Sequence, residues 1–326
     1  MKLARIAAIA LATSLLVAPP VTEARQPEQA VHVAFLATGE VSPPLWREFV
    51  KGMSEHGWVE GQNVVLEYHT GRGNRERLAS LAEQLVQAKP AVILTGGSPA
   101  TAAVKKATAT IPIVMVGVGD PVRYGFVASL TQPEANLTGL SFLANDLGVK
   151  VLELFKEIQP AARQVMVFGN PSNPGAPSFL EQLRAAAPKI GLTIQYAATT
   201  TDHELDLQLM ALERERPDAL FLVPNGFLIA ARRRILDFAA AKRLPALGIN
   251  PLFATSGALL TYSPDFSQLL RRAAWFADRL LRGAHPGDLP IEQPTRFRLV
   301  LNKKSANALG LKIPRSILLR ADRVIE

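Results

Sequence analysis

Short runs of apolar residues alternate along the chain with longer tracts in which apolar residues recur at spacings of three and four. In the first part of the chain, the runs that predict buried strands are residues 31–37, 64–68, 92–95 and 113–116. The tracts that predict helices with one apolar face are residues 45–55 and 75–87. Strands that alternate with helices are typical of an α/β fold with a parallel sheet.

The same pattern begins again after residues 136–139. Helices are predicted over 147–158, 178–190, 203–214 and 227–242, and strands over 164–168, 193–197 and 219–223. Two similar halves predict two doubly wound lobes. Because no long Gly/Ser linker separates the halves, we expect short structured crossings between the lobes and a ligand cleft where the lobes face each other.

The first residues have the pattern of a secretory signal peptide. Lys2 and Arg5 precede an uncharged, largely apolar run, 6–18, which is followed by two prolines and a small-x-small sequence. The run is shorter than the roughly 20 residues that cross a bilayer, so a permanent membrane anchor is the weaker interpretation. We therefore expect residues 1–24 to be cleaved and the mature chain to reside in the periplasm.

The composition argues against several kinds of chemistry. With no cysteine in its 326 residues, the sequence offers no disulfide, no cysteine nucleophile and no cysteine for a lipid anchor. Its 5 histidines are scattered and form no i, i+4 pair, so no metal site is predicted. Residues 117–122 lack the last glycine of a dinucleotide fingerprint, and the sequence contains no P-loop motif, so no cofactor is expected.

The formal net charge of +8 permits nucleic-acid binding but does not indicate it. The arginine clusters at 232–234 and 271–272 lie inside helical patterns, with no aromatic residues among them and no recognisable nucleic-acid-binding motif. We expect an evenly charged, solvated surface and no nucleic-acid partner.

A turn at residues 96–99 joins a predicted strand to a predicted helix. Ser98 followed by Pro99 is the pattern of a helix N-cap with proline at the first helical position. Gly96 and Gly97 let the backbone turn tightly and approach a ligand. The free N–H groups of that first turn, together with the helix dipole, favour a bound anion. The alternative interpretation is a capped helix that binds nothing.

The same stretch resembles the G-x-S-x-G nucleophile elbow of serine hydrolases, and Asp265 and His285 follow Ser98 in the hydrolase order. An elbow needs the N–H of the residue after the serine for its oxyanion hole, but Pro99 has none. Loss of one such donor typically lowers the rate by about a hundredfold to a thousandfold. A serine hydrolase is therefore the less favoured alternative, and we predict no catalytic residues.

Polar residues recur where predicted strands end. Asp120, Asn170 and Asn225 each follow a strand and lie next to proline or glycine. Each is a common turn former, which is the alternative explanation for its position. Ligands of open α/β sheets bind outside the carboxyl ends of the strands, so the repeated position of these residues and of Ser98 favours one shared cleft.

Several long segments of the sequence match the pattern of a known family. They are GWVEGQNVVLEY (57–68), LTGGSPATAAVKKATATIPIVMVGVGDPV (94–122), ANLTGLSF (135–142), FGNPSNPGA (168–176), RRAAWFADRLLRGAHPGDLPIEQPTRFRLVLN (271–302) and ALGLKIPRSILLRADRVIE (308–326). With these segments the chain resembles the substrate-binding proteins of bacterial ABC transporters, of the type that binds tryptophan and tyrosine. The resemblance covers nearly all of the sequence after the predicted signal peptide.

The resemblance implies a type I periplasmic-binding-protein fold, with two Rossmann-like lobes joined by three crossovers. We expect lobe 1 to comprise residues 31–140 plus 262–292, and lobe 2 to comprise residues 141–261 plus 293–326. Proteins of this kind close on a small solute and deliver it to an ABC permease in the inner membrane. We expect this chain to act in the same way, as a monomer.

The resemblance also implies where the ligand binds. The glycine-serine-proline turn and the Asp120-Pro121 turn would line the cleft on lobe 1, and two asparagines would line it on lobe 2. The residues predicted to bind the ligand are Gly97, Ser98, Pro99, Ala100, Asp120, Pro121, Asn170, Asn225 and Tyr262.

Residue chemistry favours an amino acid or a small carboxylate as the ligand. Helix N–H groups at Ser98 suit a carboxylate, and Asp120 could pair with an ammonium group. The aromatic residues that could pack an apolar ligand side chain, or could be ordinary core, are Tyr124, Phe126, Phe142, Phe227 and Tyr262. A second function stays open, because an exported protein of this fold could also act as a sensor that presents its closed form to a membrane receptor kinase.

Overall fold

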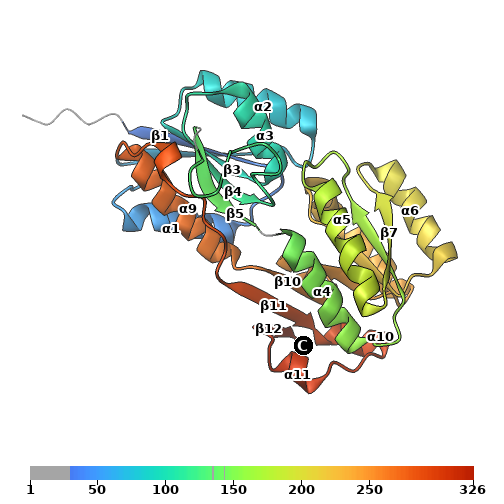
Figure 1. The fold of residues 1–326 in the computed structure, drawn as a ribbon. Coiled ribbons are helices and arrows are strands. Elements are labelled where there is room, and N and C mark those ends of the chain that lie inside the picture. The colour runs from blue at the N-terminus through green and yellow to red at the C-terminus, as the bar shows by residue number, and fades with distance from the viewer. Residues whose placement is uncertain (1–29, 134–135, 143) are drawn as a thin grey trace, which may run out of the picture.

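The computed structural model describes residues 30–133, 136–142 and 144–326, and it contains two sheets, one in each of two lobes (Figure 1). The predicted signal peptide, 1–24, lies outside the described residues. Within the described ranges, no helix combines the length and the apolar character needed to cross a membrane.

The sheet of the first lobe is entirely parallel, with strand order β2-β1-β3-β4-β5. Its strands are β1 (Val31–Ala37), β2 (Val64–Thr70), β3 (Val92–Gly96), β4 (Ile113–Val118) and β5 (Leu137–Ser141). One face is covered by α1 (Pro43–Glu55) and α9 (Phe266–Leu281), and the other by α2 (Arg75–Gln87) and α3 (Ser98–Ala107). Successive side chains of β1 point alternately to the two faces of the sheet. Phe35 packs under α1 and α9, and Leu36 packs under α2 and α3.

The sheet of the second lobe has the order β12-β11-β10-β9-β8-β6-β7, with β11 antiparallel to β10. Its strands are β6 (Gln164–Gly169), β7 (Thr193–Ala198), β8 (Ala219–Leu222), β9 (Ala246–Gly248), β10 (Leu260–Pro264), β11 (Phe297–Asn302) and β12 (Arg323–Ile325). The helices are α4 (Ala144–Ile158), α5 (Ala176–Ala186), α6 (Asp202–Glu215), α7 (Gly226–Ala241), α8 (Pro251–Thr255), α10 (Lys303–Leu309) and α11 (Arg315–Leu318). α4 and α5 pack on one face of this sheet, and α6, α7 and α8 on the other.

The predicted α/β fold with two doubly wound lobes is confirmed, and most predicted elements differ from the observed ones by only a few residues at their ends. The helix predicted over 178–190 is divided: α5 ends at Ala186 and a 3₁₀ turn, Ala187–Ile190, follows it. Pro188 accounts for the break, because its missing N–H cannot continue the α-helical hydrogen bonding.

Three crossings between the lobes lie side by side. The N–H of Ser141 donates to the carbonyl of Glu292 (2.9 Å), and the N–H of Asp265 donates to the carbonyl of Arg296 (3.0 Å). The Asp265 carboxylate also accepts two hydrogen bonds from Arg298, at 2.7 and 2.9 Å. β10 pairs with β9 at Leu260 and Thr261 and with β11 through Pro264, so residue 262, where the lobe division was expected, lies inside a strand of the second sheet.

Candidate functional site

A cavity of about 430 Å³ lies between the two lobes. On the first lobe it is lined by the segments that follow β1, β3 and β4, and on the second lobe by those that follow β6, β8 and β9. All of these segments leave the carboxyl ends of parallel strands, which is where open α/β sheets bind ligands. The cavity is therefore the candidate binding site.

Helix N-termini converge on this cavity from both lobes. Ser98 of α3, Ala176 of α5 and Gly226 of α7 are the first residues of their helices, and each lines the cavity. The first turn of a helix has N–H groups without a helical partner and carries about half a unit of positive charge from the helix dipole. Ends from both sheets thus favour a negatively charged group on the ligand.

The glycine-serine-proline turn lines the cavity, but its cap differs from the prediction. The N-cap of α3 is Gly97, whose φ of 86° favours glycine, and the helix begins at Ser98. No side chain at the N-cap position bonds the helix. Instead the hydroxyl oxygen of Thr38, in the loop after β1, accepts the N–H of Ala100 at 3.2 Å. Thr38 also lines the cavity, and it was not among the predicted site residues.

Both predicted asparagines line the cavity and also hold a local turn. Asn225 is the N-cap of α7, and its Oδ1 accepts the N–H of Leu228 at 3.0 Å. Asn170 Oδ1 accepts the N–H of Ser172 at 2.8 Å. Both asparagines are therefore turn formers. The hydrogen bond to each Oδ1 also fixes the direction in which the Nδ2 group of the same amide points.

Two further asparagines of the second lobe line the cavity and were missed. Asn173 Oδ1 accepts the N–H of Gly175 (3.1 Å), and Asn250 Oδ1 accepts that of Leu252 (3.0 Å). Within the part of the chain that the structure describes, the Nδ2 groups of Asn170, Asn173 and Asn250 have no protein partner. Their N–H groups can donate to a ligand. Asn250 precedes Pro251 just as Asn170 precedes a proline, but no strand was predicted before Asn250, so the sequence did not assign it to the cleft.

Four predicted site residues lie outside the cavity lining: Ala100, Asp120, Pro121 and Tyr262. Asp120 Oδ1 accepts the N–H of Arg123 at 3.0 Å, so the carboxylate holds the turn that follows β4. Tyr262 is stacked on Phe297, with ring centroids 5.7 Å apart, and packs against the core beneath α4. A ligand-binding role for these residues remains a prediction.

The walls of the cavity are largely apolar. Of the five aromatic residues considered from the sequence, Tyr124 and Phe142 line it, whereas Phe126 and Phe227 pack in or against the cores. Burial, and secondarily the charge of Asp120, raises the pKa of the Tyr124 hydroxyl to about 12. This hydroxyl is therefore neutral at physiological pH, and the pocket suits an apolar or aromatic ligand group.

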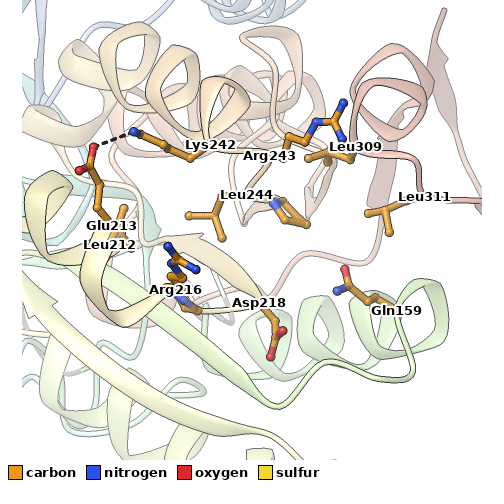
Figure 2. Close-up of a pocket in the computed structure, with 12 residues that line it drawn as sticks. Gln159, Leu212, Glu213, Arg216, Asp218, Lys242, Arg243, Leu244, Leu309 and Leu311 are labelled. Carbon is orange, nitrogen blue, oxygen red and sulfur yellow. Dashed lines mark ion pairs between the residues drawn. The ribbon is translucent and has the colours of Figure 1, made fainter.

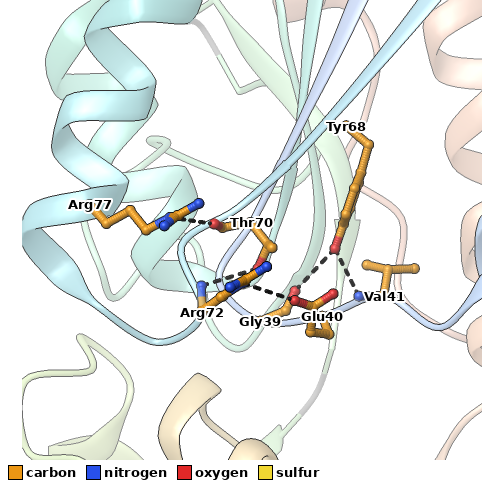
Figure 3. A network of polar contacts seen from close by, with 7 residues as sticks. All are labelled: Gly39, Glu40, Val41, Tyr68, Thr70, Arg72 and Arg77. Atoms are coloured by element: carbon orange, nitrogen blue, oxygen red, sulfur yellow. Dashed lines mark hydrogen bonds and ion pairs between the residues drawn. The ribbon is translucent and has the colours of Figure 1, made fainter.

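The loop after β1 is held in place by Tyr68 of the neighbouring strand β2 (Figure 3). The N–H of Val41 donates to the Tyr68 hydroxyl at 2.9 Å, and that hydroxyl makes a longer contact, 3.5 Å, to the carbonyl of Gly39. Burial raises the pKa of Tyr68, so the phenol stays protonated and keeps both contacts. Glu40, between these two residues, forms an ion pair with Arg72 at 3.3 Å.

The two lobes touch at the edges of the cavity. Arg123 of the first lobe and Glu181 of α5 form an ion pair across the cleft, with Nη2 and Oε2 2.6 Å apart. At another edge the backbones of Gly73 and Gly226 are so close that a Cβ on either residue would clash with the other. The structure therefore has its lobes closed over the cavity.

The serine-hydrolase alternative lacks its catalytic partners. Asp265 is engaged by Arg298 and by the N–H of Ser267, and His285 Nδ1 accepts the N–H of Gly287 at 3.2 Å. Neither residue lines the cavity that contains Ser98. Among the described residues, no group of three or more His, Cys, Asp or Glu side chains is suited to holding a metal ion.

A second cavity, of about 610 Å³, lies at the opposite ends of the strands of the second lobe (Figure 2). It is bordered by Arg216 and Arg243, which follow the carboxyl ends of α6 and α7, and by the ion pair between Lys242 and Glu213 (2.8 Å). Basic side chains are favoured at helix carboxyl ends by the helix dipole, so these arginines do not require a bound ligand to explain them. The cavity between the lobes, with its converging N-termini, is the stronger candidate.

The chain is similar to several known proteins. A tyrosine-binding protein of Clostridioides difficile (strain R20291) is 26% identical over 265 residues, which are 81% of this chain and 76% of that protein. A conserved domain protein from Vibrio cholerae is 29% identical with a TM-score of 0.85, covering 91% of this chain and 100% of that one. A Streptococcus pneumonia ABC domain in complex with L-Trp is 23% identical with a TM-score of 0.83, at the same coverage of both chains.

These similarities confirm the predicted type I periplasmic-binding-protein fold. The family model described as ABC transporter substrate binding protein matches residues 44–325, which is most of the chain. This chain belongs to the family of ABC transporter substrate-binding proteins.

Proposed function

We propose that this protein binds an amino acid with an apolar, preferably aromatic, side chain and delivers it to an ABC permease. The observation that carries the proposal is the cavity between the lobes, in which helix N-termini and asparagine amides supply donors beside aromatic walls. Donors of this kind suit an α-carboxylate, and the aromatic residues suit the ligand side chain. The tyrosine-binding relative and the tryptophan-bound neighbour support the same class of ligand.

The wider setting of this function is also a proposal. Delivery to a permease requires that the protein be exported, and the pattern of residues 1–24 supports secretion to the periplasm without a lipid anchor. We propose that the mature protein acts as a monomer and has no catalytic activity. The missing N–H at Pro99 supports the absence of serine-hydrolase chemistry.

A thermal-shift screen tests the proposed ligand class. The protein comprising residues 25–326, refolded after removal of any bound ligand, is heated with L-tryptophan, L-tyrosine, L-phenylalanine, L-lysine, L-glutamate or D-glucose. A ligand at a hundredfold excess over its Kd adds about 2.7 kcal/mol to the free energy of unfolding, which is readily measured. We expect stabilisation by the aromatic amino acids. Stabilisation by D-glucose alone would contradict the proposal.

A further inference from the structure

The charges around the cavity are distributed unequally. The converging helix N-termini and the asparagine amides serve an anion, whereas an amino acid also carries an ammonium group. Among the described residues that line the cavity, Glu40 carries the only formal charge. Asp120, the carboxylate expected from the sequence to pair with an ammonium group, is outside the lining and is engaged by the N–H of Arg123.

From this distribution we infer that Glu40 binds the ammonium group of the ligand and makes the site selective for amino acids over simple carboxylates. The inference rests on the proposed function, because it assigns one end of the proposed ligand to a residue. Glu40 has the required chemistry, since a carboxylate accepts charge-assisted hydrogen bonds from an ammonium group.

The position of Glu40 in the loop is fixed by hydrogen bonds of the neighbouring backbone groups and not by contacts of its own side chain. The loop residues on either side of it, Gly39 and Val41, are both held by the Tyr68 hydroxyl (Figure 3). The loop is also tied to the segment after β2, because the N–H of Gly73 donates to the carbonyl of Thr38 at 2.8 Å. The carboxylate is therefore carried on an ordered loop, and its side chain forms an exposed ion pair with Arg72.

The present partner of Glu40 does not prevent this role. Arg72 and Glu40 are 68% and 61% exposed, so their ion pair is in water and is weak. An ammonium group in the cavity can pair with the Glu40 carboxylate, either together with Arg72 or in its place, with little loss of free energy.

Closure of the lobes brings the second lobe against the loop that carries Glu40. Gly226, at the N-terminus of α7, packs against Gly73 and lies near Gly39, the residue before Glu40. In the closed protein the second lobe thus packs against the loop at Gly39, while the Glu40 side chain itself stays 61% exposed. The carboxylate therefore lies at the rim of the cavity, where a ligand held between the lobes can reach it.

Titration calorimetry with L-tryptophan and with 3-indolepropanoate, which lacks only the ammonium group, tests the inference. The proteins are wild type, Glu40→Gln, Asp120→Asn, and Glu83→Gln as a control for an exposed glutamate of α2 outside the cavity. We expect Glu40→Gln to bind L-tryptophan about tenfold or more weakly and 3-indolepropanoate as wild type does. The other two variants should bind both compounds as wild type does.

The alternative outcomes are distinct. Unchanged L-tryptophan affinity in Glu40→Gln, or an equal loss for both compounds, would overturn the assignment. A tenfold loss of L-tryptophan affinity in Asp120→Asn alone would move the ammonium contact to that residue and would also overturn it. If the wild-type protein binds no aromatic amino acid, the proposed function itself fails, and the assignment with it. Thermal melting of Glu40→Gln without ligand checks that its fold is intact.

Discussion

Gly73 and Gly226 meet across the cleft so closely that a Cβ on Gly226 would lie 2.2 Å from the Cα of Gly73. The two residues belong to different lobes, and the contact exists because the lobes are closed. Because one backbone belongs to each lobe, the Gly73 and Gly226 backbones can move apart only if the cleft opens. Glycine at both positions is therefore a condition of closure.

The variant Gly226→Ala is expected to hinder closure without harming either lobe. Gly226 begins α7, where alanine is a better helix former than glycine, so ligand-free stability should not fall. Affinity falls in proportion to the population of the closed state, and we expect a loss of about tenfold or more. Calorimetry gives the affinity, and small-angle scattering with ligand shows whether the particle remains extended. A wild-type affinity would show that the contact does not limit closure.

The ion pair between Arg123 and Glu181 is expected to make a small contribution to closure. Both side chains are largely exposed, so the pair contributes about 1 kcal/mol or less, or up to about fivefold in affinity. We expect Arg123→Ala to weaken ligand binding by this amount at low salt and to bind as wild type does in about 1 M salt.

A matched control is Arg320→Ala, which breaks an exposed pair with Glu157 within the second lobe. It should leave ligand affinity unchanged. A loss of affinity in Arg123→Ala that persists at high salt would rule out the electrostatic explanation.

The cap of α3 is expected to depend on Thr38 and not on Ser98. Thr38→Val keeps the shape of the side chain but removes the hydroxyl that accepts the N–H of Ala100, and we expect a loss of about 1 kcal/mol in the free energy of unfolding. Ser98→Ala should lower it by less than Thr38→Val does, because the N-cap of α3 is Gly97 and not Ser98. Urea unfolding of both variants measures the difference. A larger loss of unfolding free energy in Ser98→Ala than in Thr38→Val would show that Ser98 caps the helix.

A pH dependence is expected at Glu67, on the edge strand β2. Its carboxylate contacts Nε2 of His69 (2.5 Å) and of His32 (2.7 Å), and the hydrogen bond to His69 is the main cause that lowers its pKa below 4.5. A pKa that is lower in the folded protein stabilises the fold above the unfolded pKa, and this stability is lost as pH falls through the folded value.

We therefore expect Glu67→Gln to be less stable than wild type at pH 7, by about 1 kcal/mol or less because the group is partly exposed. The difference should shrink below about pH 4.5 and vanish in stronger acid. Chemical unfolding of both proteins between pH 3 and pH 7 measures it. A difference that is constant over this range would exclude the carboxylate as its source.

The fold could be predicted because apolar spacing reports directly on strands and helices. The run at 31–37 and the tract at 75–87 match β1 and α2 at both ends. β9 was not predicted, since it has only 3 residues and its apolar run is too short to separate from a turn. Without β9, the loop that carries Asn250 could not be assigned to the cleft.

The site was predicted in part for a related reason. The position of a loop follows from the strand before it, so Ser98, Asn170 and Asn225 could be assigned to one shared cleft. The direction of a side chain within a loop depends on its local partners. Asp120 turns to the N–H of Arg123, whereas Glu40, in a loop after an equally clear strand, lines the cavity. No sequence pattern separates these two carboxylates.

A crystal structure of the mature protein grown with L-tryptophan tests the central claim most directly. The account predicts one molecule in the cavity between the closed lobes, with its carboxylate at the first turns of the helices that begin at Ser98 or Gly226 and its indole against Tyr124 or Phe142. Tryptophan bound only in the second cavity, beside Arg216 and Arg243, would contradict it, as would an empty cleft at a saturating concentration.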